Sequence, residues 1–179
     1  MPERDQTIPA PRLSPDRAST AGSAAGSALT VRPFTEADRP FFQSIVQRLN
    51  PGRTASPRDP AVMTGYFRRL AAGEVDPPAG TESFVAIDAA NTPLGVISIY
   101  PGADYFTGHR RAYVETLVVA TEAEGRGVGR TLMAHADRWA RERGMFEVSL
   151  DVFAENMRAR DFYERCGYAV DHIRLTKRL

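Results

Sequence analysis

Three closely spaced glycines and two arginines form the stretch of this chain that is best suited to chemistry. The stretch reads GRGVGR and consists of Gly125, Arg126, Gly127, Val128, Gly129 and Arg130. The residues before it, YVETLVVA, are rich in β-branched side chains and predict a strand over 113–120. The residues after it repeat apolar side chains at helical spacing and predict a helix that stops at Gly144. The glycines therefore occupy a turn from a strand into a helix.

A glycine-rich turn of this kind offers a binding site for an anion. The first N–H groups of a helix have no partner within the helix, and the helix dipole adds partial positive charge. Bare backbone lets a ligand approach closely, and Arg126 and Arg130 add full charges. The sequence therefore predicts a pyrophosphate site for a phosphorylated cofactor. The alternative is a turn that only packs the helix against the strand.

Two familiar nucleotide-binding motifs are excluded by the spacing. A Rossmann fingerprint needs G-x-G-x-x-G, whereas here Gly129 follows Gly127 after one residue. A G-x-x-x-x-G-K-[ST] loop needs one more residue between Gly125 and Gly129, and Arg130 stands where its lysine would be. The cofactor is therefore predicted to belong to another class.

The sequence after the central helix has a second pattern. Phe146, Val148, Leu150 and Val152 alternate with polar residues and predict a half-buried strand. Asn156 then stands where it would cap a helix with Phe162 and Tyr163 on its inner face. Cys166 and Gly167 end that helix, and a further strand is expected after it.

The two motifs together, GRGVG and NMRARDFYERCGY, resemble the GNAT superfamily of N-acetyltransferases, which take acetyl from acetyl-CoA. The resemblance is strong over residues 114–168 and weaker back to residue 29. It implies an α/β fold with a central mixed, mostly antiparallel twisted sheet and helices on both faces. It also implies acetyl-CoA as the cofactor and direct attack of a primary amine on the thioester in a ternary complex.

The resemblance assigns catalytic roles to two residues. Tyr163 matches the family tyrosine that lies near the CoA sulfur and acts as general acid. Glu115, on the strand before the turn, matches a carboxylate that often serves as the base, and burial would raise its pKa. The alternatives are a core tyrosine, and a glutamate on a solvated face or in an ion pair.

The resemblance also assigns the cofactor contacts. The backbone of Leu117, Val118 and Val119 would pair with the pantetheine amides, and one N–H would face the thioester oxygen. Asn156 would bond the cofactor arm, or serve only as a helix cap.

The chain departs from the family pattern at two places. Glu124 stands where Gln or Arg is usual, and its carboxylate must point away from a pyrophosphate or pair with Arg126. Only residues 169–179 follow Tyr168, so the last strand is truncated, fused to the previous one, or supplied by a partner in a homodimer.

Composition sets the limits of these interpretations. Residues 1–28 are rich in Pro, Ser and Ala and predict a disordered tail, which leaves 29–179 as a single acetyltransferase domain. The net charge of +1 gives no basic field for nucleic acid, and no apolar run is long enough for a membrane. The single cysteine fits a reducing, cytoplasmic setting. The three histidines show no metal-ligand spacing, so no metal is expected.

The first half of the domain predicts further elements in the same order as the family. A strand over 29–33 precedes a helix that starts at Thr35 with Asp38 in a capping box. A second helix covers 60–72, with Val62, Tyr66, Phe67 and Leu70 inward, and strands follow over 83–87 and 94–100.

Two alternatives to this acetyltransferase stay open. One is a CoA-binding sensor or interaction domain without catalysis, and the other is an enzyme that uses a different acyl-CoA. The acceptor amine is not specified by the sequence. The loop before the central strand, with Tyr105, Phe106 and His109, either contacts the acceptor or forms an interface.

Overall fold

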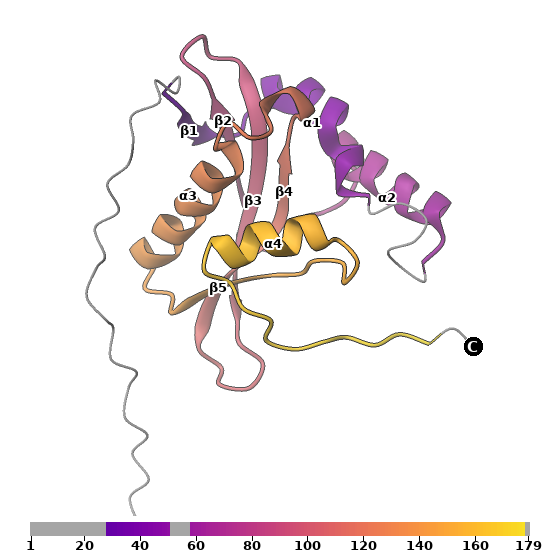
Figure 1. The fold of residues 1–179 in the computed structure, drawn as a ribbon, viewed down its shortest axis with the longest axis vertical. Helices are drawn as coiled ribbons and strands as arrows, with labels where there is room; N and C mark the ends of the chain where they lie inside the picture. Colours follow the sequence, from indigo (N-terminus) through magenta and orange to yellow (C-terminus); the bar gives the residue numbers. More distant parts are fainter. Residues whose placement is uncertain (1–27, 51–57, 178–179) are drawn as a thin grey trace, which may run out of the picture.

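A single five-stranded sheet forms the centre of the molecule (Figure 1). The computed structural model describes residues 28–50 and 58–177, so the predicted tail lies outside the described part, apart from its last residue. The strands are β1 (Thr30–Pro33), β2 (Glu82–Ile87), β3 (Pro93–Ala103), β4 (Arg110–Val119) and β5 (Glu147–Leu150). The helices are α1 (Arg39–Ile45), α2 (Pro60–Ala72), α3 (Val128–Glu142) and α4 (Met157–Arg165), with 3-10 turns η1 (Glu36–Asp38), η2 (Val46–Leu49) and η3 (Thr121–Ala123).

The sheet is mixed and mostly antiparallel, as the resemblance implies. The strands lie in the order β1-β2-β3-β4-β5; the first four are antiparallel to their neighbours, and β5 is parallel to β4. Consecutive residues of a strand point to opposite faces, and both Val96 and Ile97 of β3 are buried, so helices cover both faces. In Figure 1, α4 crosses in front of β3 and β4, with α3 beside it.

The central helix α3 is built as its periodicity predicts. Gly127 is its N-cap in the left-handed conformation, and Gly144, with φ of 66°, follows its end. The apolar stripe is buried against the sheet and consists of Val128, Leu132, Met133, Ala136, Trp139 and Ala140. This stripe holds the glycine turn at the end of β4.

The first helical region starts as predicted but is more broken. Thr35 and Asp38 form the capping box. Asp38 is only 4% exposed, and its carboxylate accepts two hydrogen bonds from the Arg32 guanidinium, at 2.6 and 2.7 Å. The predicted single helix is divided into η1, α1 and η2.

Three predicted inward-facing residues are exposed. Helix α2 spans the predicted residues, but of its four predicted core residues Val62 and Tyr66 are exposed, whereas Phe67 is buried. One face of this short helix contacts the domain, so its outer apolar residues stay at the surface. Phe146 is 81% exposed because β5 begins one residue later, at Glu147.

The predicted final strand is absent from the described residues. Residues 168–177 form no helix or strand, and β5 pairs with β4 alone. Val170, Ile173 and Leu175 are exposed on this segment. Within the part of the chain that the structure describes, no helix is both long and apolar enough to span a bilayer.

Candidate active site

Glu115 stands at an irregularity in the sheet. Ser98 of β3 pairs with Thr116 of β4, but the next residue, Ile99, pairs with Val114. Glu115 is therefore the extra residue of a β-bulge and has no partner on β3. Bulges bend a strand and redirect a side chain, and they occur often beside active sites. The sequence signal at this strand did not indicate the bulge.

Beyond the bulge, β4 has one open edge. The pairing of β4 with β5 covers only Arg111 to Val114, so residues 115–119 have no described strand on that side. This stretch includes Leu117, Val118 and Val119, the three residues expected to bind pantetheine. Unpaired backbone N–H and C=O groups can accept an extended ligand as an additional strand.

The open edge is followed by η3 and then by the glycine turn. Gly125 and Gly127 have φ of 74° and 83°, and a Cβ built at either would have no atom within 4 Å. The space over both glycines is therefore accessible to a ligand, and the first N–H groups of α3 lie at the same turn. Arg126 and Arg130 are exposed and make no ion pair within the described residues. These features fit a phosphorylated, extended ligand.

Glu124 is paired, although not with the residue expected from the sequence. Its two carboxylate oxygens make ion pairs with Arg48 of η2 and Arg158 of α4, rather than with Arg126. Hydrogen bonding from Arg158 is the main cause that lowers the pKa of Glu124. The carboxylate beside the anion site is therefore ionised and already satisfied by two arginines.

Helix α4 packs against α3 beside the turn. The Asn156 side chain accepts a hydrogen bond of 3.2 Å from the Ala159 N–H, so it caps α4 as predicted. Phe162 packs against Gly129 of α3. This close contact explains the third glycine of the motif, which serves helix packing rather than an open approach.

Tyr163 lies among other aromatic side chains. Its ring centroid is 5.2 Å from that of Phe162 and 5.9 Å from that of Tyr168. Burial raises the pKa of Tyr163 to about 12, with a smaller contribution from Cys166. The phenol therefore carries its proton at neutral pH.

The surroundings of Glu115 are different from those of Tyr163. Burial raises the pKa of Glu115, and its charge in turn raises the pKa values of Tyr66 and Tyr100, after the larger effect of their own burial. The two predicted catalytic residues thus have separate neighbours, Glu115 on β4 and Tyr163 on α4.

A second acidic group, which the sequence did not indicate, lies near the same tyrosines. Tyr100 and Tyr113 are directly paired across β3 and β4, with ring centroids 5.0 Å apart. Burial raises the pKa of Tyr113, and a hydrogen bond with Asp151 raises it further. Glu115 and Asp151 thus flank a pair of aromatic rings, and this group is called the acidic–aromatic cluster below.

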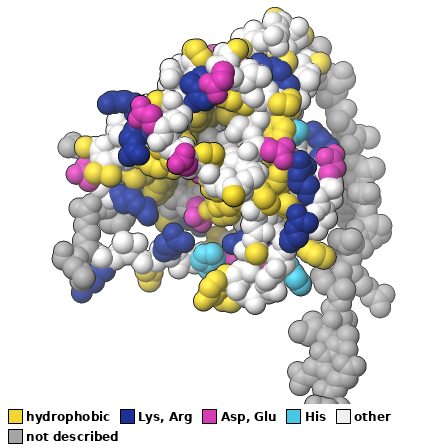
Figure 2. All heavy atoms as spheres, turned by 180° about the vertical axis from the view of Figure 1, so that it is seen from behind, with side chains coloured by type: hydrophobic (Ala, Val, Ile, Leu, Met, Phe, Trp, Pro, Cys, Tyr) yellow, Lys and Arg dark blue, Asp and Glu magenta, His cyan; other side chains and the backbone are white. Residues whose placement is uncertain are grey.

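Figure 2 shows basic and acidic side chains interspersed on the face seen from behind.

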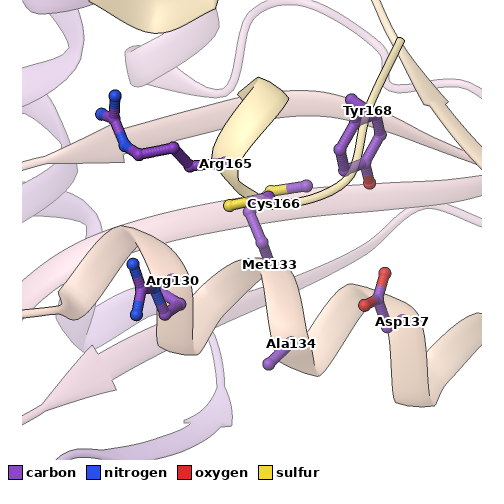
Figure 3. Close-up of a pocket in the computed structure, with 7 residues that line it drawn as sticks. All are labelled: Arg130, Met133, Ala134, Asp137, Arg165, Cys166 and Tyr168. Atoms are coloured by element: carbon purple, nitrogen blue, oxygen red, sulfur yellow. The ribbon is translucent and has the colours of Figure 1, made fainter. Parts of the chain in front are cut away.

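A pocket of about 320 Å³ lies between α3 and the end of α4 (Figure 3). Its lining residues are Arg130, Met133, Ala134, Asp137, Arg165, Cys166 and Tyr168. Burial raises the pKa of Cys166, so its thiol is protonated at neutral pH and suits packing rather than nucleophilic attack. Among the described residues no group of His, Cys, Asp and Glu is arranged to hold a metal ion.

The loop at the tip of the β3–β4 hairpin is exposed. Tyr105 and Phe106 project into solvent with their rings 5.2 Å apart, and His109 stacks near Phe146 at 5.3 Å. Both interpretations of this loop, acceptor contact and interface, remain predictions.

Curated proteins similar to this chain are acetyltransferases. Streptothricin acetyltransferase of Streptomyces lavendulae is 35% identical over 91 residues, which are 51% of this chain and 46% of that protein. Aminoglycoside N(6')-acetyltransferase type 1 of Stenotrophomonas maltophilia is 28% identical over 48% of this chain and 58% of its own length. The chain therefore spans about half the length of the curated relatives it matches.

Solved structures support the same fold. An acetyltransferase of Trypanosoma brucei has a TM-score of 0.58 at 21% identity, over 85% of this chain and 100% of that one. The aminoglycoside N-acetyltransferase AAC(6')-Iy in complex with CoA has a TM-score of 0.63 at 19% identity, over 88% of this chain and 98% of that one. At these identities the likeness establishes the arrangement of the elements.

The family itself is established by a longer match. The model of the acetyltransferase (GNAT) family, whose members use acetyl-CoA, matches residues 42–168. That range begins in α1 and includes the bulge, the open edge of β4, the glycine turn and α4. The chain belongs to the GNAT family of acetyltransferases.

Proposed function

We propose that this chain is an N-acetyltransferase that transfers acetyl from acetyl-CoA to a primary amine. The observation that carries the proposal is the open edge of β4, which runs from the Glu115 bulge into the glycine turn. An extended thioester can lie along that edge with its phosphates at one end and its acetyl group at the other.

The cofactor contacts in this proposal follow the order of the chain. Backbone groups of Leu117 to Val119 pair with the pantetheine amides, and the N–H groups that follow Gly127 at the start of α3 bind the pyrophosphate. Asn156 bonds the cofactor arm through the part of its amide that does not cap α4. Val128 and Gly129 are the first two residues of α3 and provide two of these N–H groups.

The proposed reaction is a direct transfer in a ternary complex. Glu115, directly or through a water, removes a proton from the substrate ammonium, and the amine nitrogen attacks the thioester carbonyl carbon. A backbone N–H of β4 stabilises the oxyanion. The C–S bond then breaks, and Tyr163 gives its proton to the departing thiolate. The attacking nitrogen loses its second proton as the C–S bond breaks, and this proton returns the Tyr163 phenolate to the phenol, directly or through water. The products are an acetamide, CoA and the one proton that Glu115 has accepted.

The surroundings of Tyr163 support its role as the proton donor. A donor works best when its pKa is close to that of the group it protonates. Burial raises the pKa values of both Tyr163 and the neighbouring Cys166 thiol. Burial would make a departing thiolate in the same place more basic in the same way, so it raises the pKa values of the donor and of the group that the donor protonates together.

A small-molecule amine with more than one positive charge is the favoured acceptor. Carboxylates and aromatic faces both attract ammonium groups, and the acidic–aromatic cluster offers Glu115, Asp151 and two tyrosine rings. The names of the relatives, which refer to streptothricin and aminoglycosides, support this class. The single cysteine supports a reducing, cytoplasmic setting.

The test is an acceptor panel with acetyl-CoA, in which release of the free thiol is followed. Aminoglycosides, streptothricin, polyamines, simple monoamines and lysine peptides form the panel. Faster thiol release with multivalent cationic amines than with monoamines is expected. Binding of acetyl-CoA with no amine that accelerates thiol release would favour the CoA-binding sensor without catalysis. A preference for a longer acyl-CoA would favour the enzyme that uses a different acyl donor.

A homodimer is part of the proposal. The outer edge of β5 is unpaired, and residues 168–177 offer exposed apolar side chains and no strand partner within the described chain. A second copy can supply its segment 168–177 to this edge. Sedimentation equilibrium measures the state directly, and a monomer at high concentration would contradict the dimer.

A further inference from the structure

The ion pairs of Glu124 connect three elements around the open end of β4. Arg48 comes from η2, Glu124 follows η3, and Arg158 lies in the first turn of α4. We call these three side chains the Glu124 clasp. The clasp adjoins the glycine turn, since Glu124 immediately precedes Gly125.

The two arginines of the clasp are held very differently. The Arg48 side chain is 35% exposed and also donates a hydrogen bond to Thr121 Oγ1. The Arg158 side chain is 76% exposed, and Glu124 is its one ion-pair partner among the described residues. Exposed ion pairs contribute little to stability, so Arg158 can leave Glu124 at small cost while Arg48 stays.

A phosphate group is a better partner than a carboxylate for an arginine at this position. It carries more charge and more acceptor oxygens, and the guanidinium fork binds it in bidentate fashion. The N–H groups of the turn attract it to the same place, where Arg126 and Arg130 have no ion pair within the described chain. An anion at the turn therefore competes directly with Glu124.

We propose that Arg158 is a phosphate ligand of the cofactor, and that it exchanges the Glu124 carboxylate for a phosphate oxygen when the cofactor binds. Glu124 then keeps Arg48 and no longer neutralises Arg158. The clasp thereby offsets the unfavourable carboxylate at this position, since its second arginine becomes available to the ligand. The proposal rests on cofactor binding at the glycine turn.

The experiment is isothermal titration calorimetry of the full chain with CoA and with dephospho-CoA, which lacks the 3'-phosphate. Arg158→Gln is expected to weaken CoA binding about 10-fold, because a charge-assisted hydrogen bond is lost. Glu124→Gln is expected to tighten it several-fold, because the competitor is removed. Arg141→Gln is the matched control, since Arg141 is 72% exposed and pairs with Asp137 at the far end of α3. It should leave binding unchanged.

Opposite changes in CoA affinity in the two variants distinguish the exchange from a clasp that only braces the fold. If the clasp only braces the fold, Glu124→Gln and Arg158→Gln weaken binding together, and the proposal is overturned. Arg158→Lys, which keeps the charge but loses the fork, should bind CoA with intermediate affinity, and it tests the exchange even if Glu124→Gln folds poorly. Equal binding by Arg158→Gln and the unaltered chain would also overturn the role of Arg158.

The two ligands show which phosphate is bound and keep the proposals apart. A loss confined to CoA assigns Arg158 to the 3'-phosphate, and a loss with both ligands assigns it to the pyrophosphate; either result supports the exchange. If the unaltered chain binds neither ligand, the cofactor site itself is wrong. If it binds both ligands, but Glu124→Gln and Arg158→Gln change the affinity for CoA in the same direction or not at all, only the exchange is wrong.

Discussion

The ring of Phe162 lies so close to Gly129 that a Cβ built on the glycine would stand 3.1 Å from the phenyl Cζ. The same construction at Gly127 meets nothing within 4 Å. Two glycines in one motif thus serve different purposes. Gly129 lets α4 pack on α3, whereas Gly127 leaves space for a ligand in a backbone conformation that other residues adopt only with strain.

Substitution of these two glycines should therefore give different results. Gly129→Ala crowds Phe162 and should lower the stability of the ligand-free chain by about 1–3 kcal/mol, while most of the stabilisation by CoA remains. Gly127→Val should remove that stabilisation, which is about 2.7 kcal/mol at 100 times the Kd. Thermal unfolding with and without CoA measures both. If CoA raises the melting temperature of Gly127→Val as much as that of the unaltered chain, the pyrophosphate does not bind at this turn.

Tyr163→Phe keeps the aromatic packing and removes the proton donor. Turnover should fall by about 10²–10⁴-fold while the affinity for acetyl-CoA changes little, because general acid catalysis contributes by this order. Tyr168→Phe is the control, since its hydroxyl lies in the same aromatic group and has no hydrogen-bond partner in the described structure. Near-normal turnover of Tyr163→Phe under chemistry-limited conditions would leave the tyrosine as a packing residue.

Glu115→Gln should lower turnover and remove the acidic limb of the pH–rate profile. Burial raises the pKa of Glu115 above its ordinary value of 4.5. The acidic limb of the pH–rate profile of the unaltered chain should therefore have its midpoint above pH 4.5. A carboxyl with a raised pKa in the folded state favours folding at low pH, and this contribution is lost as the pH rises through that pKa. The variant should therefore melt at a higher temperature than the unaltered chain at pH 7, and the difference should shrink toward pH 4. An unchanged acidic limb would exclude Glu115 as the base.

Asp38→Asn tests the capping box at the start of η1. The hydrogen bonds from Arg32 are the main cause that lowers the pKa of Asp38 to about 2, from 3.8. A lowered pKa contributes stability above the unfolded value, and this is lost as the pH falls toward 2. The variant should lose on the order of 2 kcal/mol at pH 7, measured by urea unfolding. A loss that does not diminish below pH 4 would point to packing instead.

Local signals explain which elements could be predicted from the sequence. Pro60 and Gly73 mark the ends of α2, and the stripe of α3 follows from its helical period, so both were predicted correctly. The error at Tyr66 arose because periodicity gives an apolar face but not whether another element covers it. The same limit applies to Phe146.

The site could be predicted only in part, for a physical reason. The glycine turn and the Asn156 cap are local, so short motifs reveal them. The bulge at Glu115 depends on how β3 pairs with β4, and the partners of Glu124 lie 76 and 34 residues away. Such contacts arise only when distant segments meet, and no spacing within one segment encodes them.

The open edge of β4 also bears on the solubility of the chain. An exposed strand edge with apolar residues such as Leu117 and Val119 is a template for pairing with another chain, and proteins usually protect such edges. A bound cofactor would cover the open edge of β4, so cofactor binding would protect the chain against aggregation. The cofactor-free protein is then the form most exposed to edge-to-edge association, and saturating CoA should protect it during concentration and storage.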